Sequence, residues 1–380
     1  MAEPLKHLIG PNTARDTAEA VARASETFDR AAFLADILPV IDDLELMQRG
    51  QCIADALHRH LPDDFEQAAS ILHSCLPGPE QGGLSGWALL SFNQYIAAHG
   101  RRDLVTSLGL LKALTPHFTG EFGIRPFIAE EQDRALAIIA GWANDPNHHV
   151  RRLASEGTRP RLPWAMRLPR LVREPSPILP ILEALIDDPE DYVRRSVANS
   201  LNDIAKDHPD LVADFVERHR AGASKDRLWL LKHASRTLIK KGHAKALANF
   251  GFEPLSDVTV TLALANDRVS FPGELGFEVR LRNNGIEART VLVDYAIHHQ
   301  KKDGSLSPKV FKGKSLTIRP GESLAFAKRH TLRPITTRVY HPGVHRLEVM
   351  LNGVVQAGAD FELTALQTPM TGSGATIETR

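Results

Sequence analysis

A short internal repeat constrains the fold of this chain more than any other feature. Asp145-Pro146 precedes Val150–Arg152, and the same arrangement recurs 43 residues later, where Asp188-Pro189 precedes Val193–Arg195. A weaker third copy begins at Leu230. Periods near 40 residues are typical of HEAT-like solenoids, in which each repeat contributes two helices. We expect each Asp-Pro pair to end one helix and each Val-Arg-Arg to open the next, inner helix, which places the arginine-bearing helices side by side.

Helical patterning extends from about residue 15 to residue 248. Apolar residues recur at three- and four-residue spacing, as in Phe33–Ile41 and Ala135–Trp142, and Pro or Gly interrupts the pattern between helices. No Gly-rich phosphate-binding loop follows a strand here, and strands do not alternate with helices. A nucleotide-binding α/β domain is therefore disfavoured.

After about residue 255 the pattern changes to short strands separated by turn signals such as Asn283–Gly285 and Pro320-Gly321. Seven strands are predicted, at 258–262, 276–282, 290–296, 314–318, 323–327, 343–351 and 358–363. Strands of this number and length predict an immunoglobulin-like sandwich. An antibody-type domain is excluded because the Cys-Trp-Cys core is missing.

The expected fold class is an all-α HEAT-like repeat solenoid followed by a C-terminal immunoglobulin-like β-sandwich. The predicted boundaries are 1–250 for the HEAT-like repeat domain and 255–366 for the sandwich. Residues 367–380 are polar, and we expect this tail to be disordered.

The chain carries no net charge, but its charges are unevenly distributed. Residues 1–100 carry 6 basic and 14 acidic side chains, residues 101–250 carry 24 and 19, and residues 251–380 carry 16 and 13. The segment Arg151–Arg173 holds seven arginines and a single acid, Glu156. Such partitioning is typical of proteins that bind polyanions, although solvated helix faces are an alternative explanation.

Other features exclude whole classes of protein. Two cysteines, Cys52 and Cys75, cannot build a disulfide scaffold or a cysteine-based zinc site, and no HExxH motif occurs, so no metal or other cofactor is expected. No apolar stretch approaches the roughly 18 residues of a membrane span, and no secretory signal is visible. We expect a monomeric protein of the cytoplasm.

Several uncommon motifs carry a family resemblance. The segments Val150–Ala165 and Tyr192–Pro209 resemble the AlkC branch of the DNA alkylation repair glycosylases, and Glu121–Phe127 and Leu231–Lys241 look like further motifs of that family. The resemblance covers residues 1–250, and the sandwich is similar to an extra C-terminal domain of some members. It implies a bacterial, monofunctional DNA-3-methyladenine glycosylase of base excision repair, acting on duplex DNA that contains alkylated bases. A lyase activity is not supported, because no motif places a lysine as a Schiff-base nucleophile.

The chemistry of such a reaction indicates which residues to examine. A base methylated at a ring nitrogen is a cation, so its glycosidic bond is already activated and needs negative charge near C1′ rather than a proton donor. Glu121, Glu156 and Asp203 are the acids expected to supply it. By the 43-residue offset Glu156 corresponds to Asn199, one helical turn before Asp203, so these carboxylates could approach one another across adjacent inner helices.

Each acid also has a purely structural explanation. Glu156 could pair with Arg152 one turn away, and Asp203 with Arg195 or Lys206. Glu121 could be a first-turn acid favoured by the helix dipole.

Trp164 completes the predicted catalytic set, because it could stack against a cationic base or the exposed deoxyribose. A core position is the alternative for this tryptophan, but Pro160 and Pro163 favour a rigid surface loop. Contacts to DNA phosphates are expected from Arg152, Arg159, Arg161, Arg194, Lys232, Arg236, Lys240, Lys241, Lys301 and Lys302.

Two questions stay open at this stage. A non-catalytic HEAT-repeat adaptor that binds DNA or protein would explain the repeats and the sandwich, but not an arginine-rich stretch with one glutamate and one tryptophan. Lys301 and Lys302 precede the turn Asp303-Gly304 and are expected to make the sandwich part of the DNA-binding surface. These lysines could instead keep an edge strand soluble.

Overall fold

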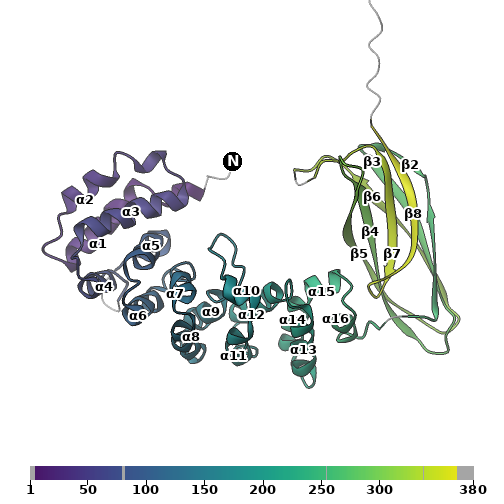
Figure 1. Cartoon of the computed structure of the whole chain (residues 1–380), viewed down its shortest axis with the longest axis horizontal. Helices are drawn as coiled ribbons and strands as arrows, with labels where there is room; N and C mark the ends of the chain where they lie inside the picture. The colour runs from purple at the N-terminus through teal and green to yellow at the C-terminus, as the bar shows by residue number, and fades with distance from the viewer. Residues whose placement is uncertain (1–4, 79–81, 254, 337, 366–380) are drawn as a thin grey trace, which may run out of the picture. The chain divides into compact units, whose positions relative to one another are not determined.

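The computed structural model describes residues 5–78, 82–253, 255–336 and 338–365. The chain divides into two compact units, Met1–Ser235 and Arg236–Arg380 (Figure 1). The tail 367–380, predicted to be disordered, lies outside the described residues. No helix in the described ranges has the length and apolar character needed to cross a membrane.

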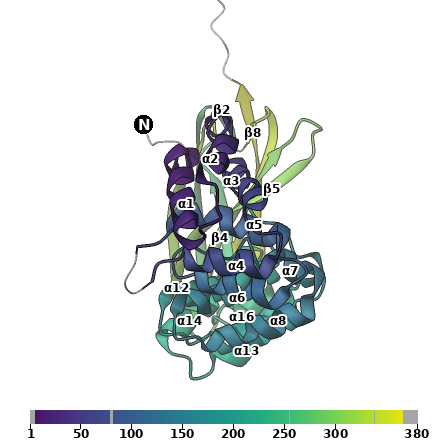
Figure 2. The ribbon, with the colours of Figure 1, turned by 90° about the vertical axis from the view of Figure 1, so that its left-hand side faces the viewer.

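The first unit is helical. Its α-helices are α1 (Pro11–Ala24), α2 (Arg30–Ile37), α3 (Leu46–His60), α4 (Phe65–Ser74), α5 (Leu89–His99), α6 (Leu104–Leu114), α7 (Arg125–Glu130), α8 (Gln132–Gly141), α9 (His148–Glu156), α10 (Pro169–Arg173), α11 (Leu179–Ala184), α12 (Asp191–Ile204), α13 (Pro209–Arg220) and α14 (Lys225–Ala234). Helices α1, α2 and α3 pack together at the N-terminal end (Figures 1 and 2).

Local sequence explains where many of these helices begin. The side chains of Asp29, Asp64, Asp103, Asn147 and Ser224 accept hydrogen bonds from backbone amides in the first turns of α2, α4, α6, α9 and α14. Such caps contribute about 1 kcal/mol each, because they satisfy amides that have no partner within the helix.

Packing between α9, α12 and α14 positions the candidate site. Helix α9 packs against α12, and α12 packs against α14. Figure 1 shows α12 and α14 on the upper side of the unit, with α11 and α13 below them. The two helices bury apolar residues such as Leu153, Val197 and Leu201, and they also bury the charged side chains of Glu156 and Asp203.

The second unit begins with two short helices, α15 (Arg236–Lys240) and α16 (Ala244–Ala248), and continues as a β-sandwich. Its strands are β1 (Val258–Leu264), β2 (Arg268–Phe271), β3 (Gly273–Asn283), β4 (Arg289–Gln300), β5 (Leu306–Ile318), β6 (Ser323–Leu332), β7 (Gly343–Leu351) and β8 (Val354–Ala365). They form a three-stranded sheet in the order β1-β3-β6 and a five-stranded sheet in the order β2-β8-β7-β4-β5.

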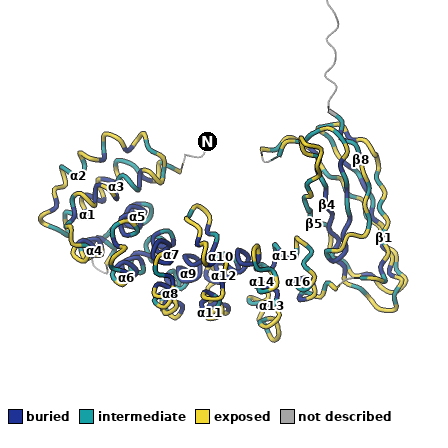
Figure 3. The backbone as a smooth tube through the Cα atoms, in the orientation of Figure 1, coloured by how far each residue is buried: buried dark blue, intermediate teal, exposed yellow. Residues whose placement is uncertain are grey.

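The sandwich core comes from residues at every second position of facing strands. Phe277 and Val279 of β3 are buried, as are Val293 and Tyr295 of β4. Figure 3 shows buried residues interspersed with less buried ones along the strands. This period of two places alternate side chains on the inner face of each sheet.

One close approach joins the short helices to the sandwich. Gly353, in the turn between β7 and β8, has a φ of +79°, and a Cβ built on it would lie 2.5 Å from Cα of Gly242. Gly242 follows α15 and also has a positive φ, +72°. Only glycine combines this backbone conformation with so little space.

The expected fold class needs correction. About 47% of the chain is helical and the C-terminal part is a β-sheet domain, so all-α does not describe it; the helical part fits HEAT-like repeats. The repeat is also irregular between α9 and α12, where α10 and α11 have only five and six residues. Prolines in the first turns of these two helices explain their start points.

The strand predictions also differ in detail. The sequence missed β2, a four-residue strand that pairs in parallel with β8. It also predicted β5 as 314–318, whereas the strand begins at Leu306. Pro308, Lys309, Lys312 and Gly313 in this stretch hid the strand, because these residue types are uncommon in strands. Pairing with β4 and the packing of Phe311 against Tyr295 hold it in place.

Candidate active site

Three carboxylates that are far apart in the sequence are linked by arginine side chains. Nη1 of Arg152 lies 2.5 Å from Oε2 of Glu121, and its Nη2 lies 3.4 Å from Oε1 of Glu156. Arg159 joins Glu156 to Asp203, since Nη1 donates to Oε1 of Glu156 at 2.6 Å and Nε donates to Oδ2 of Asp203 at 2.8 Å. We call these five residues the carboxylate cluster.

Different elements supply the members of the carboxylate cluster. Glu121 lies in the turn before α7, Arg152 and Glu156 lie on α9, Arg159 follows α9, and Asp203 lies in the last turn of α12. The packing of α9 against α12 brings these side chains together. The structure therefore places the three predicted acids in one cluster, although the repeat offset concerned only Glu156 and Asp203.

The cluster is largely buried. Glu156, Arg159 and Asp203 are 6%, 8% and 2% exposed. Burial by itself would lower the pKa of Arg159, but the carboxylates of Glu156 and Asp203 outweigh this effect and raise its pKa. The arginine therefore stays charged, and its two ion pairs hold the carboxylates in a defined geometry.

Some of the ion pairs that a purely structural role of these acids predicts are present. Glu156 contacts Arg152 as well as Arg159, and Lys206 donates to Oδ1 of Asp203 at 2.8 Å. Arg195, by contrast, pairs with Asp191 on its own helix. Structural pairing and catalysis are compatible here, because the same arginines that neutralise the carboxylates also fix their positions.

A cavity of about 360 Å³ adjoins the carboxylate cluster. Residues 115–119, Glu121, His149, Arg152 and Tyr192 line it. The Arg152 guanidinium lies over the ring of Tyr192, 4.9 Å from the centroid, a cation–π contact. Burial lowers the pKa of His149, and the charges of His148 and Arg152 lower it further. Sequence reasoning assigned no role to Tyr192, although it stands directly before the second Val-Arg-Arg.

Trp164 lies in the loop between α9 and α10. Its side chain is 81% exposed and its φ is +62°, a left-handed conformation that is uncommon for a residue with a side chain. The tip of this loop is exposed in Figure 3. A core position is thus excluded for Trp164.

Sequence reasoning also missed Arg125, on the first turn of α7. This arginine is fully buried and donates to three backbone carbonyls, those of Met166, Gly157 and Arg159, at 2.6, 2.9 and 2.9 Å. Burial lowers its pKa to about 10. No local sequence signal identifies such a residue, because all three acceptors are backbone atoms more than 30 positions away.

The first arginine of each Val-Arg-Arg motif binds backbone carbonyls of the preceding turn. Nη1 of Arg151 donates to the carbonyls of Asp145 and Pro146 at 3.0 and 3.1 Å. Arg194, at the equivalent position of the next repeat, does the same with the carbonyls of Asp188 and Pro189 at 2.7 and 2.8 Å. The first arginine of Val-Arg-Arg therefore holds the Asp-Pro turn that precedes it.

This geometry bears on the phosphate contacts predicted from sequence. Arg194 is 8% exposed, and its guanidinium donates hydrogen bonds to backbone carbonyls. These contacts favour a structural role for Arg194 over the expected phosphate contact. Arg152 and Arg159 are bound to carboxylates rather than presented to solvent. Arg161 forms a two-bond pair with Asp207, both bonds 2.8 Å long. Sequence could not separate these roles, because arginine reaches several acceptors from one position.

The remaining predicted DNA contacts lie at several places. Lys232 on α14, Lys240 at the end of α15 and Lys241 are exposed, and Arg236 opens α15. Lys301 and Lys302 are exposed in the hairpin that joins β4 to β5. Their proposed contacts with phosphate stay predictions.

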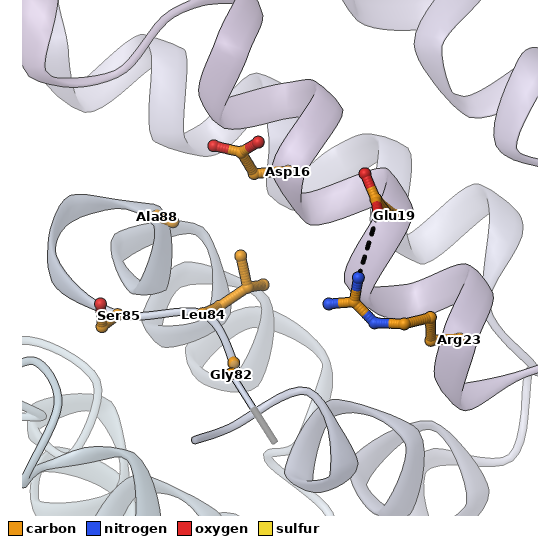
Figure 4. A pocket seen from close by; sticks show the side chains of 8 residues that line it. Asp16, Glu19, Arg23, Gly82, Leu84, Ser85 and Ala88 are labelled. Carbon is orange, nitrogen blue, oxygen red and sulfur yellow. Dashed lines mark hydrogen bonds and ion pairs between the residues drawn. The ribbon is translucent and has the colours of Figure 1, made fainter. Parts of the chain in front are cut away.

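A second cavity, of about 710 Å³, lies between α1 and the segment 82–88 (Figure 4). Glu19 and Arg23 in its wall form an i, i+4 ion pair. None of the predicted site residues lines this cavity. Across the described parts of the chain, no three His, Cys, Asp or Glu side chains form a group that could hold a metal ion.

Comparisons with known proteins bear directly on the carboxylate cluster. Residues 120–238 match the family described as DNA alkylation repair enzyme. The uncharacterized protein YhaZ of Bacillus subtilis (strain 168) is 37% identical over 339 residues, which cover 88% of this chain and 92% of YhaZ. The chain belongs to the DNA alkylation repair enzyme family. The resemblance found in the sequence is confirmed.

One solved structure matches this DNA alkylation repair protein over nearly its whole length. It is the Pseudomonas fluorescens alkylpurine DNA glycosylase AlkC bound to DNA containing an abasic site analog, with a TM-score of 0.81 and 34% identity, covering 96% of this chain and 100% of that chain. Residues 259–365 match a second family, described as the C-terminal Ig-like domain of uncharacterised protein YhaZ.

The DNA alkylation repair match contains the whole carboxylate cluster. Glu121, Glu156, Trp164 and Asp203 all fall within residues 120–238, as do Arg125 and Tyr192. The site assembled by α7, α9 and α12 is therefore part of the family's shared region and not of the Ig-like domain.

Proposed function

We propose that this protein is a DNA glycosylase that hydrolyses the N-glycosidic bond of cationic N-alkylated bases, such as 3-methyladenine, in duplex DNA. The carboxylate cluster carries the proposal, because Glu121, Glu156 and Asp203 converge within the region that matches the DNA alkylation repair family. The likeness to AlkC over 96% of the chain supports it.

The cluster suits this reaction chemically. The bond between C1′ and the alkylated base breaks with its electron pair going to the cationic ring, so the base leaves neutral and the sugar becomes an oxocarbenium-like cation. Fixed carboxylates stabilise that cation electrostatically, and one of them accepts the proton of the water that adds to C1′. Trp164, exposed at the loop tip, is available to pack against the sugar or base.

We further propose that the enzyme acts as a monomer without a cofactor and leaves an abasic site without cutting the strand. Its substrate places it with the chromosome in the cytoplasm. Lys301 and Lys302 of the sandwich add contacts to the DNA backbone.

Incubating the purified chain with a duplex that contains 3-methyladenine tests the proposal. Release of the free methylated base, with strand breaks only after treatment that cleaves abasic sites, is the expected result. Binding of the duplex without release would contradict it and would identify a DNA-binding adaptor instead.

A further inference from the structure

Arg125 fastens both ends of the loop that follows α9. Its Nη1 donates to the carbonyls of Gly157 and Arg159 near the start of the loop, and its Nε donates to the carbonyl of Met166 near the end. A hydrogen bond of 3.2 Å from the amide of Leu168 to the carbonyl of Pro160 closes the loop at its base. The side chain of Arg125 itself is 0% exposed.

The segment held in this way contains two residues of the candidate site. Arg159 bridges Glu156 to Asp203, and its own carbonyl is one of the three acceptors of Arg125. Trp164 lies between the two fastened ends, with its backbone in the left-handed region. An exposed aromatic side chain on a strained backbone keeps a defined position only when its surroundings hold the loop.

The close contact of Gly157 with Ile124, the residue before α7, bears on the same loop. A Cβ at position 157 would lie 2.2 Å from Cδ1 of Ile124, the residue before Arg125. A side chain there would force the loop or the Ile124 side chain to move, without changing any charge.

We infer that Arg125 is a positioning residue, which sets the loop 157–166 so that Arg159 keeps Glu156 and Asp203 in place and Trp164 meets the damaged nucleotide. The inference rests on the proposed glycosylase function. Arg125 touches neither substrate nor reacting atoms and acts through the loop. Misplacing catalytic groups by about 1 Å can lower turnover on the order of 10²-fold.

The chain offers a matched control in Arg49. This arginine is 2% exposed and also donates to three backbone carbonyls, those of Leu44, Ile9 and Asp42, at 2.7, 2.8 and 2.8 Å. It lies on α3, outside the region that matches the DNA alkylation repair family. A loss that comes only from removing a buried arginine would therefore appear in variants of either residue.

The test compares Arg125→Lys, Arg125→Met and Arg49→Lys in the full chain. Two quantities are measured under conditions where all variants are folded: kcat for release of 3-methyladenine, and the ratio of affinities for duplexes with and without a tetrahydrofuran abasic-site analogue. We expect Arg125→Met to lower kcat at least about 10-fold and Arg125→Lys by less, because lysine keeps the charge but not the forked donors. The affinity ratio should fall in the same order, and Arg49→Lys should change neither quantity more than about twofold.

A double-mutant cycle with Trp164→Ala separates positioning from stability. If Arg125 acts through the loop, Arg125→Lys should lower kcat less in the Trp164→Ala background than in the wild type. Equal fold losses in both backgrounds would overturn the inference, as would wild-type kcat in both Arg125 variants or an equal loss in Arg49→Lys.

Two further outcomes of this test, misfolding of the Arg125 variants and absence of base release by the wild type, also lead to a decision. If both Arg125 variants fail to fold, Gly157→Ala carries the test: a loss of kcat supports the inference, and wild-type kcat overturns it. If the wild type releases no base, the proposed function fails, and the affinity ratio still decides the role of Arg125. An unchanged ratio in Arg125→Lys would then overturn the inference.

Discussion

Arg159 and Asp203 are 44 positions apart in the sequence and are joined by a buried hydrogen bond of 2.8 Å from Nε to Oδ2. The same guanidinium binds Glu156 through Nη1. The bridge ties the end of α9 to the end of α12, the two inner helices of successive repeats. The geometry of the candidate site thus depends directly on how the repeats pack.

The first prediction concerns the carboxylates. Converting Glu121, Glu156 or Asp203 to its amide should lower base release on the order of 10²-fold or more, because each amide removes a negative charge from the developing sugar cation. Release of free base and binding of an abasic duplex are measured in parallel, and binding should be largely retained.

Asp188→Asn is the matched control for these amides. Asp188 is buried and accepts two hydrogen bonds from Arg151, at 2.6 and 3.0 Å, but lies outside the carboxylate cluster. This variant should lower the free energy of unfolding while the folded protein keeps its turnover. Amide variants that all match the turnover of the wild type would remove the three acids from the mechanism.

The second prediction concerns Arg161. Its side chain is partly exposed and pairs with Asp207. Arg161→Ala should weaken DNA binding and reduce the slope of log affinity against log salt by about one unit, because one phosphate contact is lost. Asp207→Asn removes the partner without removing the cation, so affinity should hold or rise. An unchanged slope in Arg161→Ala would mean that this residue does not touch the backbone.

The third prediction concerns the sandwich. Replacing Lys301 and Lys302 together by alanine should reduce the salt slope by about two units, since both exposed side chains are proposed to contact phosphates. Arg268→Ala is the comparison, because Arg268 is an exposed cation on β2 that already pairs with Glu362. Equal slopes for the double variant and the wild type would restrict DNA binding to other parts of the chain.

The fourth prediction concerns stability at acidic pH. Burial lowers the pKa of His299 to about 3 and that of His330 to about 4, with nearby cations adding to both shifts. Below the ordinary value of about 6.5 the unfolded chain takes up protons that the folded sandwich does not, so the free energy of unfolding should fall as pH decreases. Between pH 7 and pH 5, the protonation of His299 in the unfolded chain should lower the free energy of unfolding by about 2 kcal/mol.

His299→Phe tests this effect by urea unfolding at several pH values. His299 is 4% exposed, and neither ring nitrogen has a partner among the described residues. The variant should lose less stability than the wild type between pH 7 and pH 5 by about 2 kcal/mol. The exposed His7→Phe serves as a control. Identical pH dependence in wild type and His299→Phe would contradict the shift.

Sequence alone determined the local structure and the neighbourhood of the acids. Helical and strand periods follow from the spacing of apolar side chains, and the 43-residue repeat placed Glu156 near Asp203 because equivalent positions of stacked repeats are neighbours. Strand β2 escaped detection because four residues are too short for a period to show. Trp164 was expected at the surface because prolines flank it, and there it lies.

Only the tertiary structure decided which arginine meets which partner. Arg151, Arg152, Arg159 and Arg194 look alike in sequence, yet two of them bind Asp-Pro carbonyls and the other two bridge carboxylates. A long side chain with five donors can reach many acceptors, so packing, and not local pattern, selects among them. Arg125 is the extreme case, because its three acceptors are backbone carbonyls that only the folded loop presents.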